Sequence, residues 1–330
     1  MRIEKSVTSI SWIPSEAMTG MMKLPMDLGI SHYDDPLPDH IDSLEDLRQN
    51  DRFRFANELR AWIDVEDDEI VDAGYSGGGH IGATTIAIGP GSVTIPAVPF
   101  PDLRDEPVIE NGVAKFRQTA GGRTGAPMPR TVSRPPFVQI TAPTAWTTLD
   151  LMISLDGATS FEVVGASPFP RHWIYDDNDD LAAKSGLIDY SSWSKEYFGD
   201  NTPWGDVDSP AMVTEVETAL ERELSAHIMR DEHKAEIRML GEGERLTEEG
   251  SPGDELYLLL DGVLSVEVGG EKLAELGPGA IVGERAILEG GTRTSTLHAI
   301  TPVKVAVATA SQIDEHRLME LAAGHMREGS

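Results

Sequence analysis

The sequence predicts a mainly β protein of the α+β class, built from two domains. Short β-prone segments separated by turn residues recur along most of its 330 residues. The chain has 8 Phe, 6 Trp and 6 Tyr, yet Tyr257 is the only one of them after Trp204, so the two regions must build their cores from different side chains. We predict a β-rich barrel or sandwich domain at residues 1–208, a linking helix at 209–229, and a β-roll with flanking helices at 230–330.

Four hairpins account for most of the predicted N-terminal domain. Residues 53–71 form two β-prone segments around "EDDE", and similar pairs are "TTIAIGPGSVTIPAV", "LDLMISLDGATSFEVV" and "RHWIYDDNDDLAAKS". Hairpins in series are typical of a barrel or a sandwich. We also expect one helix around residues 40–50 and another near 191–198.

The predicted linking helix starts at Ser209, which suits the N-cap, with Pro210 at the first helical position. One face of this helix is apolar and carries Val213, Val216, Leu220, Leu224 and Ile228.

A second amphipathic helix is predicted in the segment "SQIDEHRLMELAAGHM" near the end of the chain. Ser311 is its expected N-cap, with Asp314 three residues later. Its apolar face carries Leu318, Leu321, Ala322 and Met326. We expect both helices to pack together on the roll.

Composition excludes several classes of partner. The formal charge of −29 repels nucleic-acid phosphates and anionic lipid headgroups, so we expect neither nucleic acid nor membrane as a partner. The sequence has no Cys, and its first residues, "MRIEKSVTSISWIP", contain no continuous apolar region of a signal peptide. The most apolar run, "LYLLLDGVLSVEV", is shorter than the ~20 residues of a membrane helix. We therefore expect a cytoplasmic protein.

Two catalytic motifs occur by letter in "GYSGGGHIGATTIAIG". Residues 74–78 match Gly-x-Ser-x-Gly, and residues 77–82 match Gly-x-Gly-x-x-Gly. Both motifs require a helix immediately afterwards, whereas "TTIAI" is β-prone. The pattern therefore favours a hairpin loop, and Ser76 and His80 stay as candidates only for a rival interpretation in which the first domain is an enzyme.

Two charged segments resemble ligand sites but are better explained otherwise. Asp176 begins "DDNDD", but a calcium-binding EF-hand loop would need Gly and Glu where Leu181 and Leu187 stand, so we predict a hairpin turn and no metal. Residues 115–134 carry five basic and no acidic side chains. A solvated loop is favoured there over a site for an anionic ligand or an acidic protein. The five residues are Lys115, Arg117, Arg123, Arg130 and Arg134.

The stretch "GPGAIVGERAILEGGTRTST" at residues 277–296 has the residue types of an anion site. Gly283 allows close approach of a ligand to the backbone, and the start of the helix-prone "ERAIL" offers unpaired N–H groups. Arg293 can give charge-assisted hydrogen bonds to a phosphate, and Glu284 can accept from a sugar hydroxyl. Together these groups suit a nucleotide.

This stretch resembles the phosphate-binding cassette of the cyclic-nucleotide-binding domain family. The resemblance extends over about 90–100 residues through a glycine framework. That framework comprises Gly243, Gly250, Gly253 with Asp254, Gly262 and Gly279. Arg285 departs from the family, in which an apolar residue is common at this position.

The resemblance implies a role for each residue of the cassette. Glu284 would bind the ribose 2′-hydroxyl and Arg293 the cyclic phosphate. Gly283, Arg285 and Ala286 would supply backbone groups, and Thr294 and Ser295 would lie beside the phosphate or the base. The implied ligand is a cyclic nucleotide, and we favour cAMP narrowly over cGMP, because a hydroxyl residue after the Arg occurs in receptors for both.

The family also implies a regulatory protein with an output elsewhere in the chain. Only about 20 residues follow Ala310, room for one helix, so we expect no appended helix-turn-helix and an output domain that does not bind DNA. The alternatives are a nucleotide-regulated enzyme or ligand-binding barrel in the first domain, and a scaffold protein with a degenerate sensor that meets a protein partner.

Overall fold

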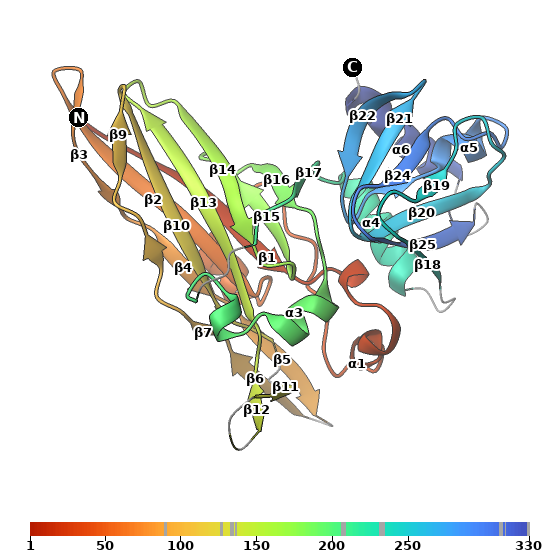
Figure 1. Ribbon diagram of the computed structural model, residues 1–330, viewed down its shortest axis with the longest axis horizontal. Coiled ribbons are helices and arrows are strands. Elements are labelled where there is room, and N and C mark those ends of the chain that lie inside the picture. The colour runs from red at the N-terminus through yellow and green to blue at the C-terminus, as the bar shows by residue number, and fades with distance from the viewer. Residues whose placement is uncertain are drawn as a thin grey trace. The chain divides into compact units, whose positions relative to one another are not determined.

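The computed structural model describes residues 1–88, 91–125, 128–132, 135, 137–205, 209–230, 235–309, 313 and 315–328. The chain divides into two compact units (Figure 1). The N-terminal unit comprises Met1–Ile13, Gly20–Ser185 and Tyr190–Val213. The C-terminal unit comprises Pro14–Thr19, Gly186–Asp189 and Thr214–Ser330, so it includes two short segments from the first 208 residues.

Two antiparallel sheets make up most of the N-terminal unit (Figure 1). One sheet has the order β17-β16-β15-β1-β2-β3, with β4 also paired to β2. Its strands are β1 (Arg2–Trp12), β2 (Phe55–Glu66), β3 (Glu69–Tyr75), β4 (Gly78–Ile81), β15 (Arg171–Tyr175), β16 (Leu181–Ser185) and β17 (Val213–Thr214).

The other sheet has the order β14-β13-β10-β7, with β8 and β9 also paired to β10. Its strands are β7 (Val98–Pro99), β8 (Leu103–Arg104), β9 (Val108–Glu110), β10 (Val113–Arg123), β13 (Thr144–Ser154) and β14 (Thr159–Ala166). Two further hairpins are β5 (Ala83–Ile88) with β6 (Gly91–Pro96), and β11 (Met128–Thr131) with β12 (Val138–Thr141). The helices of this unit are α1 (Leu24–Asp27), α2 (Leu44–Gln49) and α3 (Tyr190–Glu196).

The core of the N-terminal unit lies between the two sheets. Leu59 and Ile63 from β2 pack in one cluster with Phe116 from β10 and with Leu149 and Leu151 from β13. Alternate residues of β2, β10 and β13 face this core, as expected for a β-sandwich. The described strands form no closed barrel, so of the two predicted architectures the sandwich is the one observed.

The predicted hairpins and helices of this unit are confirmed where the structure describes them. Asp67 and Asp68 both have positive φ, which is the geometry of a tight hairpin turn between β2 and β3. The acidic run at residues 176–180 is a hairpin turn, in which the N–H of Asp176 donates to the carbonyl of Asp180 at 2.9 Å. Strand β5, rather than a helix, follows the glycine-rich motifs, and β4 lies within them.

The prediction of a solvated loop at residues 115–134 is wrong for its first part. Strand β10 contains Lys115 and Arg117, and both contact the buried carboxylate of Asp150 on β13, at 2.7 Å and 2.6 Å. Arg117 and Asp150 are directly opposite one another in the ladder, so the basic side chains neutralise the charge of Asp150 on the neighbouring strand. Arg134 lies outside the described residues.

In its described residues, the C-terminal unit is a roll of two four-stranded antiparallel sheets with three α-helices (Figure 1). The sheet orders are β18-β25-β20-β23 and β19-β24-β21-β22. The strands are β18 (Glu236–Leu240), β19 (Arg245–Thr247), β20 (Glu255–Asp261), β21 (Leu264–Val268), β22 (Glu271–Leu276), β23 (Ile281–Val282), β24 (Thr296–Ala299) and β25 (Val303–Thr309). The helices are α4 (Ala219–Arg230), α5 (Glu284–Leu288) and α6 (Glu315–Glu328).

The linking helix begins ten residues later than predicted. Residues 213–214 form a strand, and Pro210 makes a β-bridge with Gly165 instead of starting a helix. Thr218 caps α4: the N–H of Glu221 donates to the hydroxyl of Thr218 at 3.2 Å, and the N–H of Thr218 donates to the Glu221 carboxylate at 2.8 Å. This reciprocal capping box satisfies two N–H groups, which the Ser209-Pro210 start would not do for this helix.

The C-terminal helix packs as predicted in the part that the structure describes. Leu318 and Leu321 of α6 are buried in one cluster with Leu224 and Ile228 of α4 and with Leu258 of β20. The predicted cap, Ser311 with Asp314, lies outside the described residues, as does the side chain of Met326. Among the helices that the structure describes, none has the length and apolar composition required to traverse a bilayer.

Candidate functional site

A pocket of about 450 Å³ opens in the roll of the C-terminal unit. It is lined by Gly283, Glu284, Arg285, Ala286, Arg293, Thr294 and Ser295, which are the seven residues singled out from the sequence. The loop after β23, helix α5 and the loop that leads into β24 bring them together, although they are spread over thirteen positions of the chain.

Gly283 sets the geometry at the start of α5. Its φ of 99° lies in the left-handed region, and it occupies the N-cap position of the helix. A Cβ atom at this position would lie 2.7 Å from Nη1 of Arg293 and from the carbonyl oxygen of Glu255. Only glycine therefore allows the backbone, the guanidinium and β20 to come this close.

Arg293 is 5% exposed and its guanidinium is fixed from several directions. Its Nη1 donates to the carbonyl of Glu255 at 2.8 Å, and its Nη2 donates to the hydroxyl of Tyr257 at 3.1 Å. A Cβ atom at Gly253 would overlap the Nε atom, so Gly253 and Gly283 both border the guanidinium. The packing of Arg293 thus gives a steric reason for glycine at two positions of the sequence pattern, and the sequence alone does not show this reason.

The rest of the pocket wall is mostly aliphatic. It comprises Val266, Val268, Leu273, Ala274, Leu276, Val282 and Leu297, together with the polar residues Thr247 and Glu215. Sequence reasoning missed these residues, although the alternation of apolar residues along 264–268 is a signal for one inward face. Leu273 is 65% exposed in spite of its apolar side chain, so a flat apolar group could cover it.

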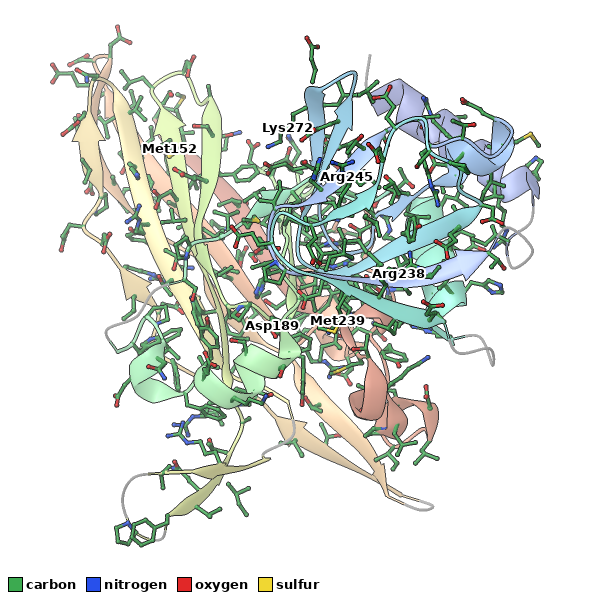
Figure 2. All side chains as sticks on the ribbon, turned by 45° about the vertical axis from the view of Figure 1, so that its right-hand side comes forward. Met152, Asp189, Arg238, Met239, Arg245 and Lys272 are labelled. Atoms are coloured by element: carbon green, nitrogen blue, oxygen red, sulfur yellow. The ribbon has the colours of Figure 1, made fainter. Side chains whose placement is uncertain are left out.

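Charges near Arg293 are balanced by neighbours in the roll. Arg238, on the edge strand β18 (Figure 2), pairs with the Glu255 carboxylate at 3.1 Å. The hydrogen bond from Arg238, followed by that from Tyr257, holds the pKa of Glu255 below its usual value. Burial, and then the hydrogen bond to Glu255, raises the pKa of Tyr257. Both groups therefore keep their ordinary protonation states near neutral pH.

This arrangement can bind an anion that carries hydroxyl groups. The guanidinium of Arg293 and the first amides of α5 supply donors, and the buried Glu284, 4% exposed, supplies a carboxylate. The aliphatic wall supplies a surface for an apolar ring.

The two candidates for an enzyme in the first domain have different partners. The hydroxyl of Ser76 donates to the carboxylate of Glu4, and Nε2 of His80 lies 2.7 Å from the carboxylate of Glu58. Ser76 and His80 therefore each contact a different carboxylate, and the structure does not join them in a Ser–His pair. Within the described part of the chain, no three His, Asp or Glu side chains are grouped as metal ligands would be.

The comparison with known families decides what the roll is. The model of the cyclic nucleotide-binding domain matches residues 237–317, which contain the whole cassette and most of the roll. Residues 237–317 are a cyclic nucleotide-binding domain.

Curated relatives match short stretches of the chain. The cGMP-dependent protein kinase egl-4 of Caenorhabditis elegans is 38% identical over 69 residues, which cover 21% of this chain and 9% of the kinase. The cyclic nucleotide-gated potassium channel mll3241 of Mesorhizobium japonicum is 41% identical over 56 residues, which cover 17% of this chain and 15% of the channel. The chain thus spans well under a fifth of the length of these relatives.

A solved structure of a cyclic nucleotide-binding domain from Methylobacillus flagellatus is also similar, at 23% identity. The match covers 35% of this chain and 74% of that one, with a TM-score of 0.28.

Proposed function

We propose that the protein is a cyclic nucleotide receptor, in which the C-terminal unit binds cAMP and the N-terminal sandwich is a regulatory output that does not bind DNA. The observation that carries the proposal is the position of Arg293. Its guanidinium is buried, aligned by two hydrogen bonds and set beside the N-terminus of α5 in a pocket of nucleotide size. Such a site is suited to a desolvated phosphate.

Each cassette residue has a role in the proposed complex. Arg293 pairs with the cyclic phosphate, and the backbone of Gly283, Arg285 and Ala286 donates to the same oxygens. Glu284 accepts from the ribose 2′-hydroxyl. Thr294 and Ser295, which line the pocket beside Arg293, contact the phosphate or the base.

The aliphatic wall favours adenine over guanine. The Watson–Crick edge of guanine carries more polar groups than that of adenine, so placing it against Val266, Leu273 and Leu276 leaves more of them unpaired. Two observations favour cGMP as the second candidate. Thr294, which follows Arg293, is a hydroxyl residue that lines the pocket, and the kinase relative is described as cGMP-dependent.

Calorimetry on the intact chain tests the proposal and selects the base. We expect micromolar or tighter binding of cAMP, weaker binding of cGMP, and little binding of 5′-AMP, whose phosphate carries more charge and is not constrained in a ring. Arg293→Ala is the matched control for site occupancy. Tighter binding of cGMP would replace cAMP as the ligand, and failure of both cyclic nucleotides to bind would overturn the receptor.

A cytoplasmic receptor with no nucleic-acid or membrane partner agrees with the charge of −29. The output would then act through a protein partner, and recovery of the protein from native lysate with and without cAMP identifies a nucleotide-dependent one. A duplex DNA shift assay at physiological salt provides the opposing test. A sequence-specific shift would contradict the proposed output.

A further inference from the structure

Tyr257 is the only aromatic residue after Trp204, and it lies on β20 with 3% of its surface exposed. Its ring packs in the interior cluster of the roll with Leu259, Val282 and Val305. A Phe would fill this position equally well. The hydroxyl therefore requires an explanation of its own, because burying a polar group in an apolar core costs free energy unless its hydrogen bonds are made.

Three side chains surround the Tyr257 hydroxyl. Its oxygen lies 2.7 Å from Oε2 of Glu255, 3.1 Å from Nη2 of Arg293 and 3.4 Å from Nη1 of Arg238. Ionised Glu255 can only accept and both arginines can only donate, so the single hydroxyl proton goes to Glu255. The oxygen lone pairs are then directed to the two arginines.

The guanidinium of Arg293 is thereby held in one orientation. The Glu255 carbonyl accepts from Nη1 and the Tyr257 hydroxyl accepts from Nη2, while Gly253 and Gly283 border the group. A guanidinium has five N–H donors, so these two contacts leave up to three for a ligand in the pocket. If the guanidinium were not held in this orientation, it would have to be ordered during binding, and that entropy cost would reduce affinity.

We propose that Tyr257 is a positioning residue for nucleotide binding: its hydroxyl, oriented by Glu255 and Arg238, aligns Arg293 with the phosphate. This inference rests on the proposed function of the pocket. Tyr257 does not itself line the nucleotide pocket, and it acts through Arg293.

Tyr257→Phe removes the hydroxyl and retains the ring, so it separates alignment from packing. We expect a 5- to 20-fold loss of affinity for the preferred cyclic nucleotide in the intact chain. Tyr175→Phe is the matched control, because Tyr175 is also buried and its hydroxyl donates to the carbonyl of Pro38 at 2.9 Å in the N-terminal unit. That control should bind like the wild type.

A double-mutant cycle with Arg293→Lys provides a result that a merely structural role would not give. A lysine ammonium cannot form both contacts of the planar guanidinium, so adding Tyr257→Phe to Arg293→Lys should cause less than a twofold further loss. If the two losses instead multiply, Tyr257 does not act through Arg293 and the inference is wrong.

Thermal unfolding of each variant checks that it is folded. If Tyr257→Phe is unfolded, Glu255→Gln takes its place, since it weakens the acceptor that orients the hydroxyl and should reduce affinity two- to fivefold. Wild-type affinity in the folded variant would overturn the inference while leaving the receptor intact. If the wild-type protein binds neither cyclic nucleotide, the proposed function and this inference both fail.

Discussion

The carboxylate of Glu221 accepts a hydrogen bond from the backbone N–H of Ile281, 2.9 Å away in a buried environment. Glu221 is also the acidic partner in the capping box of α4. Ile281 is two residues before Gly283, where the cassette begins. One side chain thus joins the start of α4 to the strand that leads into the candidate site.

The first prediction concerns this link. Glu221→Ala should lower the free energy of unfolding by about 2–4 kcal/mol, because it leaves a buried N–H unpaired and removes half of a capping box. Urea denaturation measures the change. The control is Glu223→Ala on the same helix, where the exposed carboxylate of Glu223 pairs with Arg317 of α6 at 3.0 Å. This substitution should change stability by no more than about 0.5 kcal/mol. Equal effects would contradict a special role for Glu221.

The start of α4 shows how sequence signals compete. Ser209 with Pro210 and Thr218 with Glu221 are both helix-start patterns, and the apolar positions Val213 and Val216 extend the helical period to the earlier one. The structure uses the later pattern because Glu221 satisfies a buried N–H on β23 as well as the helix terminus. That second contact joins residues 60 positions apart and has no local signal.

The second prediction concerns the two charged residues of the pocket. Arg293→Ala should weaken cyclic nucleotide binding by about 2–5 kcal/mol, since a desolvated phosphate would lose its counter-charge. Glu284→Gln should cause a smaller loss and remove most of the discrimination against the 2′-deoxy nucleotide. Arg245→Ala, at a 47% exposed side chain on β19 (Figure 2), is the matched control. Titration calorimetry gives all three values, and unchanged affinity in Arg293→Ala would refute the assignment.

The third prediction concerns Gly253. Its φ is outside the left-handed region, so alanine fits the backbone, but the new Cβ would overlap Nε of Arg293. Gly253→Ala should therefore displace the guanidinium and reduce nucleotide affinity at least tenfold, or about 1.4 kcal/mol. Gly241→Ala is the control, because its Cβ would meet nothing closer than 3.7 Å. Wild-type affinity in Gly253→Ala would mean that Arg293 is not required where the structure places it.

The candidate site was predictable where its residues lie close together in the sequence. Seven lining residues between 283 and 295 follow from one motif, since a short helix and the loop after it keep them together. The residues that hold Arg293 were not predictable. Glu255 and Tyr257 reach it from a strand 36 or more positions away, and the one sequence signal was an isolated aromatic residue in an aliphatic roll. The prediction of a solvated loop for the basic residues of β10 failed for the same reason, because their partner Asp150 lies on another strand, far away in the sequence.

The fourth prediction concerns pH. Burial, and then the charge of Asp189, raises the pKa of Asp261 to about 6 from its ordinary 3.8. A raised folded-state pKa means that the folded protein binds the proton more tightly than the unfolded chain. The favourable contribution is complete below about pH 4 and is lost as the pH rises through 6. Asp261→Asn should therefore be more stable than the wild type at pH 7.5, by up to about 3 kcal/mol, and equally stable at pH 4.

Thermal or urea unfolding of the two proteins between pH 4 and 8 measures that difference. Asp189→Asn removes the second cause of the shift, so it should give a smaller gain over the same range. A difference between Asp261→Asn and the wild type that does not vary with pH would rule out titration of Asp261 as its source.

The last prediction concerns residues 14–19, which belong to the C-terminal unit although they directly follow the N-terminal strand β1 in the chain. Glu16 is 5% exposed, and the hydroxyl of Ser225 on α4 donates to its carboxylate at 3.1 Å. The same helix contributes Leu224 and Ile228 to the cluster that contains Leu321 of α6, with Ile287 of α5 packed against it. Helix α4 therefore shares a hydrophobic cluster with the cassette helix and contacts the segment that contains Glu16.

A ligand shifts the equilibrium between two arrangements of a protein only by binding one of them more tightly. If a cyclic nucleotide alters α4 in this way, residues 14–19 should respond as well, because Ser225 on α4 contacts Glu16. We expect cAMP to change amide hydrogen exchange in α4 and at residues 15–18 of the intact protein. In Glu16→Ala the change in α4 should persist while that at residues 15–18 falls by at least half. Glu16→Gln, whose amide oxygen can still accept from Ser225, should retain most of it. A full response at residues 15–18 in Glu16→Ala would show that this hydrogen bond does not couple the segment to α4.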